Sequence, residues 1–129
     1  MIYWRIKVFI KDRGTDVIRE WLKDMPRGAQ IEVNTRLRYL RTLKTWKGRP
    51  LSAKRKGTGD IYEIIISWNK NQYRPLGFFG PKEDEFTLLI GAQEKDWKLE
   101  PKNADEIAER RRKLILEGGD NIDDYFKEI

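Results

Sequence analysis

Apolar and polar residues alternate at the start of the chain. In residues 2–9 every second side chain is apolar on the face formed by Ile2, Trp4, Ile6 and Val8. A period of two is typical of a β-strand with one buried face. After Gly14 the apolar residues follow a helical spacing instead, at Val17, Ile18, Trp21, Leu22 and Met25. The pattern therefore predicts an opening strand followed by a first helix.

A second helix is predicted from Pro26 to about Trp46. Proline fits a first helical turn, where its missing N–H is not needed. Apolar residues then recur at helical intervals, at Val33, Leu37, Leu40 and Leu43. Arg38 and Arg41 fall on another side of this helix, which would bury one stripe and expose a basic one.

Three strands are predicted next, over residues 61–68, 72–79 and 85–91. Asn69-Lys70-Asn71 forms the turn between the first two. The core face of the first strand is expected to consist of Tyr62, Ile64, Ile66 and Trp68. Pro75 cannot donate to a ladder, so we expect a bulge or a local sheet edge at that position.

A last helix is predicted to begin at Pro101 and Asn103, where Asn103 and Glu106 have the spacing of a capping box. Gly118-Gly119 ends it. Its buried face is expected to contain Ala104, Ile107, Ala108, Leu114 and Ile115. The predicted order is β-α-α-β-β-β-α, which is an α+β fold with a small, mostly antiparallel twisted sheet.

The prediction divides the chain into a single domain over residues 1–117 and an acidic C-terminal tail over residues 118–129. The element order is complete before Gly118, so we expect the tail to be a mobile cover outside the core. Tyr125 and Phe126 are expected to anchor it weakly, with the glycines as a hinge. Its charge is opposite to that of the basic part of the chain.

Charge is unevenly distributed. The formal net charge is +6. Residues 1–60 hold 16 Lys and Arg against 6 Asp and Glu, whereas residues 61–129 hold 11 against 15. No acid occurs between Glu32 and Asp60, and the cations of this interval are Arg36, Arg38, Arg41, Lys44, Lys47, Arg49, Lys54, Arg55 and Lys56. Such a block suggests a polyanionic partner, and the alternative is a solvated helix face.

The sequence contains no cysteine and no histidine. Disulfide scaffolds, thiol nucleophiles, Cys/His zinc sites and histidine-based triads are therefore excluded. A metal site built only from carboxylates stays open, but no D-x-D or EF-hand-like cluster occurs, and we expect no cofactor and no metal. No apolar run approaches the length of a membrane span, and we expect a cytoplasmic protein without a membrane partner.

Three segments of the chain share an order and spacing that point to a known family. The first is Arg49–Lys54 followed by Gly59-Asp60-Ile61-Tyr62-Glu63. The second is the strand Gln72-Tyr73-Arg74-Pro75-Leu76-Gly77-Phe78-Phe79, and the third is Leu88–Lys95 with Pro101 and Ala108–Arg111. Together these segments resemble the RelE/ParE/HigB toxin superfamily, in particular its phage-derived HigB-like (RelE-like) branch, over roughly residues 2–116.

The resemblance implies two N-terminal helices packed on a twisted sheet, with a helix near the C-terminus. It also implies a type II toxin that cuts mRNA on the ribosome without a metal, by attack of a 2′-OH on the adjacent phosphate. Two positions that are usually basic in the family carry Ile65 and Glu94 here. Fewer cations would stabilise a dianionic transition state less, which indicates a diverged or weak endoribonuclease.

The matched positions make Arg74 and Lys95 the candidate catalytic residues. RNA-binding candidates are Lys54, Arg55, Lys56, Tyr73 and Trp97. Arg74 has an alternative as the cross-strand ion-pair partner of Glu63. The alternative for Tyr73 is core packing, and the alternative for the cations of residues 54–56 is a solvated turn.

The resemblance implies three partners: a cognate antitoxin, expected to be a small helix-turn-helix protein, the ribosome and its mRNA. Two other functions remain open. One is a ParE-like toxin that binds gyrase, and the other is a non-catalytic nucleic-acid-binding module of phage origin.

Overall fold

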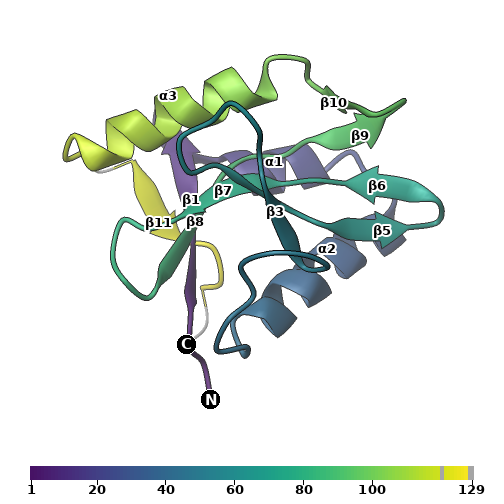
Figure 1. Ribbon diagram of the computed structural model, residues 1–129, viewed down its shortest axis with the longest axis horizontal. Coiled ribbons are helices and arrows are strands. Elements are labelled where there is room, and N and C mark those ends of the chain that lie inside the picture. Colours follow the sequence, from purple (N-terminus) through teal and green to yellow (C-terminus); the bar gives the residue numbers. More distant parts are fainter. Residues whose placement is uncertain (120, 128–129) are drawn as a thin grey trace.

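The computed structural model describes residues 1–119 and 121–127, and it shows an α+β protein in which helices pack on both faces of a bent sheet (Figure 1). The elements are β1 (Arg5–Lys11), the 3-10 turn Asp12–Gly14, β2 (Thr15–Asp16), α1 (Val17–Leu22), α2 (Arg27–Leu40), β3 (Ser52–Lys54), β4 (Tyr62–Ile64), β5 (Ile66–Trp68), β6 (Asn71–Tyr73), β7 (Leu76–Phe79), β8 (Glu85–Ile90), β9 (Gln93–Lys95), β10 (Lys98–Glu100), α3 (Ala104–Leu116) and β11 (Ile122–Asp124).

The strands form two hydrogen-bonded groups. One has the order β11-β1-β8-β7-β4-β3, with β2 paired to β1, and the other has the order β10-β9-β6-β5. β1 and β8 run parallel, and the other pairs are antiparallel. The α+β class is thus confirmed. The predicted order of seven elements is not reproduced, because the structure contains more strands than the sequence pattern indicates.

The first two of the three predicted central strands are interrupted, at Ile65 and at Arg74-Pro75. The third ends at Ile90 close to its predicted end, and after Gly91-Ala92 the chain continues as a further strand, β9, at the same level of the sheet. Pro75 has no N–H to give to a ladder, and the register shifts between Leu76 and Gly77 immediately after it. The irregularity expected at Pro75 is therefore confirmed. Its consequence is a bend that divides the sheet into its two groups.

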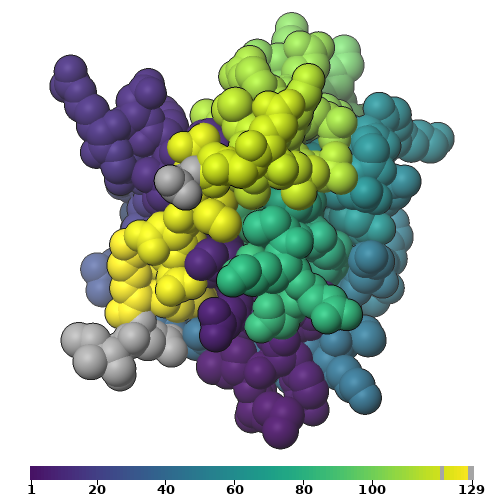
Figure 2. Space-filling view, turned by 90° about the vertical axis from the view of Figure 1, so that its left-hand side faces the viewer, coloured from purple at the N-terminus to yellow at the C-terminus, as the bar shows by residue number. Residues whose placement is uncertain are grey.

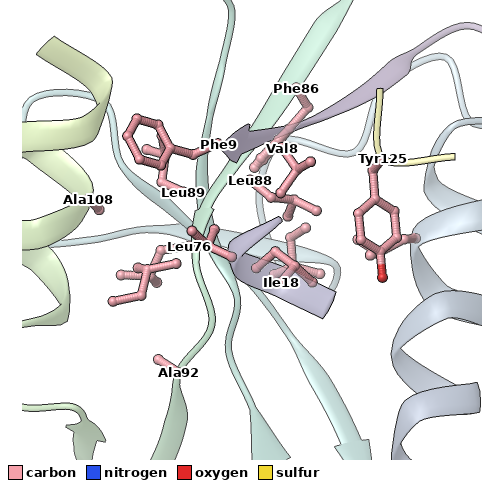
Figure 3. Close-up of a cluster of buried hydrophobic side chains, with 14 of the residues drawn as sticks. Val8, Phe9, Ile18, Leu76, Phe86, Leu88, Leu89, Ala92, Ala108 and Tyr125 are labelled. Carbon is pink, nitrogen blue, oxygen red and sulfur yellow. The ribbon is translucent and has the colours of Figure 1, made fainter. Parts of the chain in front are cut away.

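The core lies on both faces of the bent sheet (Figure 3). α1 and α2 cover one face and α3 packs against β7 and β8 on the other. Two glycines allow the closest approaches. A Cβ on Gly28 of α2 would lie 2.2 Å from the Trp68 ring, and one on Gly91 would lie 2.0 Å from the Trp21 ring. α2 can therefore sit directly on β5, and α1 can sit directly on the chain where it leaves β8.

α2 ends at Leu40, six residues before the predicted end. The apolar spacing continues to Leu43, but Thr42 donates its hydroxyl to the Tyr39 carbonyl and the chain turns. Trp46 then leaves the helical path and stacks on Phe86, with ring centroids 4.9 Å apart. Burial of this indole among aromatic rings overrides the local helical pattern.

α3 begins where predicted, but the capping box does not form. Asn103 makes no side-chain cap hydrogen bond, and its ψ of 22° lies outside the extended region that a capping side chain requires. The predicted end is confirmed, because Gly118 has a φ of +92° and its N–H donates to the Ile115 carbonyl. A left-handed glycine at this point is a common helix terminator.

The prediction that the tail lies outside the core is wrong for its described part. Ile122–Asp124 forms β11 against β1, and Tyr125 is fully buried with its hydroxyl donating to Asn34. Phe126 packs beneath the guanidinium groups of Arg38 and Arg41, each 4.4 Å from the ring centroid. Figure 2 shows this segment in yellow beside the N-terminal strand in purple. Asp120 and Glu128, which contribute to the predicted tail charge, lie outside the described residues.

None of the helices within residues 1–119 and 121–127 combines the length and the apolar character that crossing a membrane requires.

Candidate functional site

A chain of ion pairs runs from the bend of the sheet, past β4, to the start of α3. Arg74 Nε lies 3.0 Å from Glu63 Oε2, and Arg55 Nη1 lies 3.2 Å from Glu63 Oε1. Arg55 also donates two hydrogen bonds, of 2.9 and 3.1 Å, to Asp105. Bidentate pairs of this kind hold a guanidinium in one orientation. The order Asp105–Arg55–Glu63–Arg74 thus links α3, the β3–β4 loop and the bend of the sheet.

The guanidinium of Arg74 bonds to groups of the protein itself. Its guanidinium donates to the carbonyl oxygens of Ile66 and Tyr73 and to the side chain of Gln72, in addition to its pair with Glu63. Only 8% of the residue is exposed. The ion pair weighed as the alternative for Arg74 is present, and the side chain ties together strands that break at this level. A catalytic role for Arg74 remains a prediction.

Arg55 is more accessible than Arg74. Its side chain is 25% exposed, and its hydrogen bonds to Asp105 are the main reason why the pKa of Arg55 is raised above its ordinary value. It lines an open hollow, here called the Trp97 hollow, whose walls are Arg55, Trp97, Lys98, Leu99, Lys102 and Asp105. Three cations, one carboxylate and an exposed indole therefore line the same hollow.

Trp97 stands at the tip of the β9–β10 hairpin. It is 93% exposed, whereas Leu99 two residues later is buried and fixes the hairpin to the body of the protein. β9 pairs with β6, so the hairpin continues the sheet. A rigid element thus presents a bare aromatic ring to solvent.

Lys95 does not converge with Arg74. Gln72 pairs directly with Glu94, and Gln72 contacts Arg74, so Glu94 shares the Arg74 face. Side chains alternate along a strand, which places Lys95 on the opposite face. The structure therefore does not bring the two predicted catalytic residues together. It does set Lys95 directly opposite Lys98 at the hairpin.

The other RNA-binding candidates are dispersed. Lys54 and Lys56 are exposed, but Lys54 lies across from Tyr62 on the face turned away from Arg55 and Glu63. Tyr73 is only 2% exposed and packs against Trp21, and burial raises its pKa. The core-packing alternative is the one the structure shows for Tyr73, whose ring has no open face for a base.

The basic interval from Arg36 to Lys56 is also less uniform than its sequence indicates. Arg38 and Arg41 cover Phe126, and the Lys47 ammonium lies 4.8 Å from the Phe79 ring centroid. Arg55 is engaged by two carboxylates. Several of these cations thus contact rings and carboxylates of the protein itself. The surface that the basic interval offers to a polyanion is therefore smaller than its sequence indicates.

Lys98, Lys102 and Asp105 are site residues that the sequence analysis did not select. The only local signal for the lysines is their spacing with Lys95, at intervals of three and four residues around Trp97. Asp105 carries no such signal, since its role depends on Arg55, which lies fifty residues earlier. Across residues 1–119 and 121–127, no group of His, Cys, Asp or Glu side chains has the arrangement to hold a metal ion.

The family model described as "Phage derived protein Gp49-like (DUF891)" matches residues 20–113. The chain belongs to the Gp49-like family of phage-derived proteins. This family is part of the RelE-like group of type II toxins. The matched span includes Arg55, Glu63, Arg74 and Trp97, and it ends before β11. No curated protein and no solved structure matches the chain significantly.

Proposed function

We propose that this Gp49-like protein is the toxin of a type II toxin–antitoxin system and that its target is mRNA on the ribosome. The observation that carries the proposal is the Trp97 hollow, which Arg55, Lys98 and Lys102 line together with an exposed indole. Cations that contact phosphates and an aromatic ring that contacts a base are the two features that single-stranded RNA sites combine.

The proposed chemistry is metal-independent cleavage. The 2′-OH of a nucleotide attacks the adjacent phosphate, the bond to the 5′-oxygen of the next nucleotide breaks, and a 2′,3′-cyclic phosphate and a 5′-hydroxyl end form. Arg55 is the cation best placed to stabilise the developing charge, because it is partly exposed and held in orientation by Asp105. In this proposal Glu63 holds the Arg55 guanidinium in place through their ion pair, and Arg74 in turn fixes the Glu63 carboxylate.

A second candidate is a member of the same fold group that binds its target without cutting RNA, either a gyrase-binding toxin or an RNA-binding module. Two observations favour it. Arg74 directs its donors to the protein itself, and Lys95 lies on the other face of the sheet. Ile65 and Glu94 supply no cation.

Purified translating ribosomes separate the two candidates. A defined mRNA is translated with and without the protein, and primer extension maps any new 5′ ends. The proposal predicts cuts within the translated reading frame, none in naked RNA, and loss of the cuts in the Lys98→Ala/Lys102→Ala variant. Cleavage of naked RNA that EDTA abolishes would contradict it. Inhibition without any cut supports the RNA-binding module, and translation that continues unchanged supports the gyrase-binding toxin.

A cognate antitoxin, the expected helix-turn-helix partner, belongs to the same proposal. Co-expression of the toxin with the product of the adjacent reading frame is expected to restore growth and to give a complex that co-purifies.

A further inference from the structure

Residues 95–98, at the tip of the β9–β10 hairpin, combine three features that each disfavour the folded state. The first is conformational. Asp96 and Trp97 form a two-residue turn, and both have a left-handed backbone, with φ of +50° and +68°. Turns of this type prefer Asn, Asp or Gly first and Gly second, so Asp96 suits its position, whereas a bulky aromatic residue with positive φ such as Trp97 is an outlier.

The second unfavourable feature is electrostatic. Lys95 and Lys98 are directly paired across the two strands that the turn connects, and both are exposed. Like charges at directly opposed positions destabilise a strand pair. The third is the 93% exposed indole itself, which buries almost no apolar surface. An isolated hairpin tip gains nothing in stability from any of the three.

The neighbouring hairpin shows that the fold does not demand them. β5 and β6 are joined by Asn69 and Lys70, which have φ of +49° and +66°. There Asn occupies the first position, which it tolerates well, and a hydrophilic lysine occupies the position that corresponds to Trp97. Features that lower the stability of the fold without any structural need are expected at functional sites.

We infer that the Trp97 tip is a stacking platform for an unpaired nucleobase, and that Lys95, Lys98 and Lys102 contact the flanking phosphates. The site then binds single-stranded RNA in preference to a duplex, and it has little preference for the identity of the base. The inference rests on the proposed function, because it specifies the form of RNA bound at the same site. A bound phosphate would relieve the Lys95–Lys98 repulsion, and a stacked base would cover the indole. Every base presents a π-face, which makes stacking tolerant of sequence.

A duplex does not satisfy the same geometry. In A-form RNA the bases are stacked on each other and their faces are covered, so only the backbone and the groove edges reach a protein. The indole would then have no partner, while the lysines would still meet phosphates. Stacking and charge therefore make separate contributions that separate variants can remove.

The test compares binding of a labelled, unstructured single-stranded RNA with binding of a duplex of the same length, using the full-length protein. Trp97→Gly removes the ring and also suits a positive φ, so the melting temperature is expected to be equal or higher. We expect its affinity for the single strand to fall roughly 5- to 150-fold and its affinity for the duplex to change less than about twofold. Trp97→Phe is expected to retain part of the single-strand affinity.

Lys70→Gly is the matched control, because it relieves the same backbone strain in the neighbouring hairpin. It is expected to leave the preference for the single strand unchanged. In a parallel titration over salt concentration, Lys98→Ala and Lys102→Ala are each expected to lower the slope of log affinity against log salt by about 0.7.

Two results overturn the inference without touching the proposed function: unchanged single-strand affinity in Trp97→Gly, or an equal loss for single strand and duplex. The first would assign the indole to a different partner, such as a protein. If the wild-type protein binds no free RNA even at low salt, the inference fails, whereas the proposed function fails only if translating ribosomes also show no cuts.

Discussion

The carboxylate of Glu63 pairs with the guanidinium of Arg74 at 3.0 Å, and each side chain is only 10% exposed. Removing one partner of a buried ion pair typically costs about 3–5 kcal/mol when the other charge is left alone, and because Arg55 also pairs with Glu63 the lower end of that range applies here. Arg74→Ala is therefore expected to lower the free energy of unfolding by about that amount in urea denaturation. Lys113→Ala serves as a control, because its pair with Glu117 is exposed and spans 4.0 Å. An Arg74→Ala variant as stable as the control would show that the pair is not structural.

This expectation changes how a loss of toxicity in Arg74→Ala is to be interpreted. The family resemblance predicts that the variant loses activity with an intact fold, whereas the structure predicts that the fold itself is weakened. Double variants with Glu63→Gln separate the two, because simultaneous removal of both charges leaves less of the penalty. Activity restored together with stability indicates a positioning role.

Tyr125 gives a second stability prediction. It is fully buried, and truncation of a large buried aromatic side chain costs about 3–5 kcal/mol. Tyr125→Ala and deletion of residues 119–129 are both expected to lower the melting temperature strongly. Tyr39→Ala is the matched control, since Tyr39 is 51% exposed. A deletion variant with the melting temperature of the full chain would show that the fold does not need this segment.

The same tyrosine predicts a dependence on alkaline pH. Burial raises the pKa of Tyr125 from 10.0 to about 12. Between these values the unfolded chain releases a proton that the folded chain keeps, so the free energy of unfolding falls as the pH rises, by up to about 2–3 kcal/mol. Tyr125→Phe is expected to flatten that decline in denaturation curves recorded over the alkaline range that spans the two pKa values. A part of the decline remains, because burial also raises the pKa of Tyr73.

The periodicity of the sequence predicts the elements better than their arrangement. The opening strand, the starts of all three helices and the irregularity at Pro75 follow from local spacing and from backbone chemistry. The place of β11 does not, because its partner β1 lies more than a hundred residues earlier in the chain. The end of α2 is likewise decided by Trp46 and its distant aromatic neighbours.

The candidate site shows the same division. Trp97 was selected because a tryptophan between Asp96 and Lys98 in a predicted loop is unusual, and it is exposed. Arg55 was selected for its charge, but its ties to Glu63 and Asp105 depend on tertiary contacts. Arg74 and Lys95 lie on opposite faces of the sheet, which sequence spacing alone does not reveal, and their catalytic roles stay predictions.

Lys95→Glu tests whether the hairpin tip sacrifices stability for binding. A carboxylate introduced at this position would lie directly opposite Lys98 and would replace repulsion by attraction across the strands. We expect the free energy of unfolding to rise by a few tenths to about 1 kcal/mol, and single-stranded RNA affinity to fall. Thermal melting and RNA titration on the same preparation measure both. Lower stability, or unchanged RNA affinity, would contradict the proposed role of the tip.

The central claim is that the Trp97 hollow makes the protein a toxin that acts on mRNA. Growth after induction in bacterial cells, followed by mapping of transcript 5′ ends, tests it most directly. We predict that the wild-type protein and a Lys23→Ala/Lys82→Ala control arrest growth and produce cuts inside translated reading frames. The Lys98→Ala/Lys102→Ala variant, which keeps the fold because both side chains are exposed, is expected to do neither. Full toxicity of that variant, or growth arrest with intact transcripts, would contradict the claim.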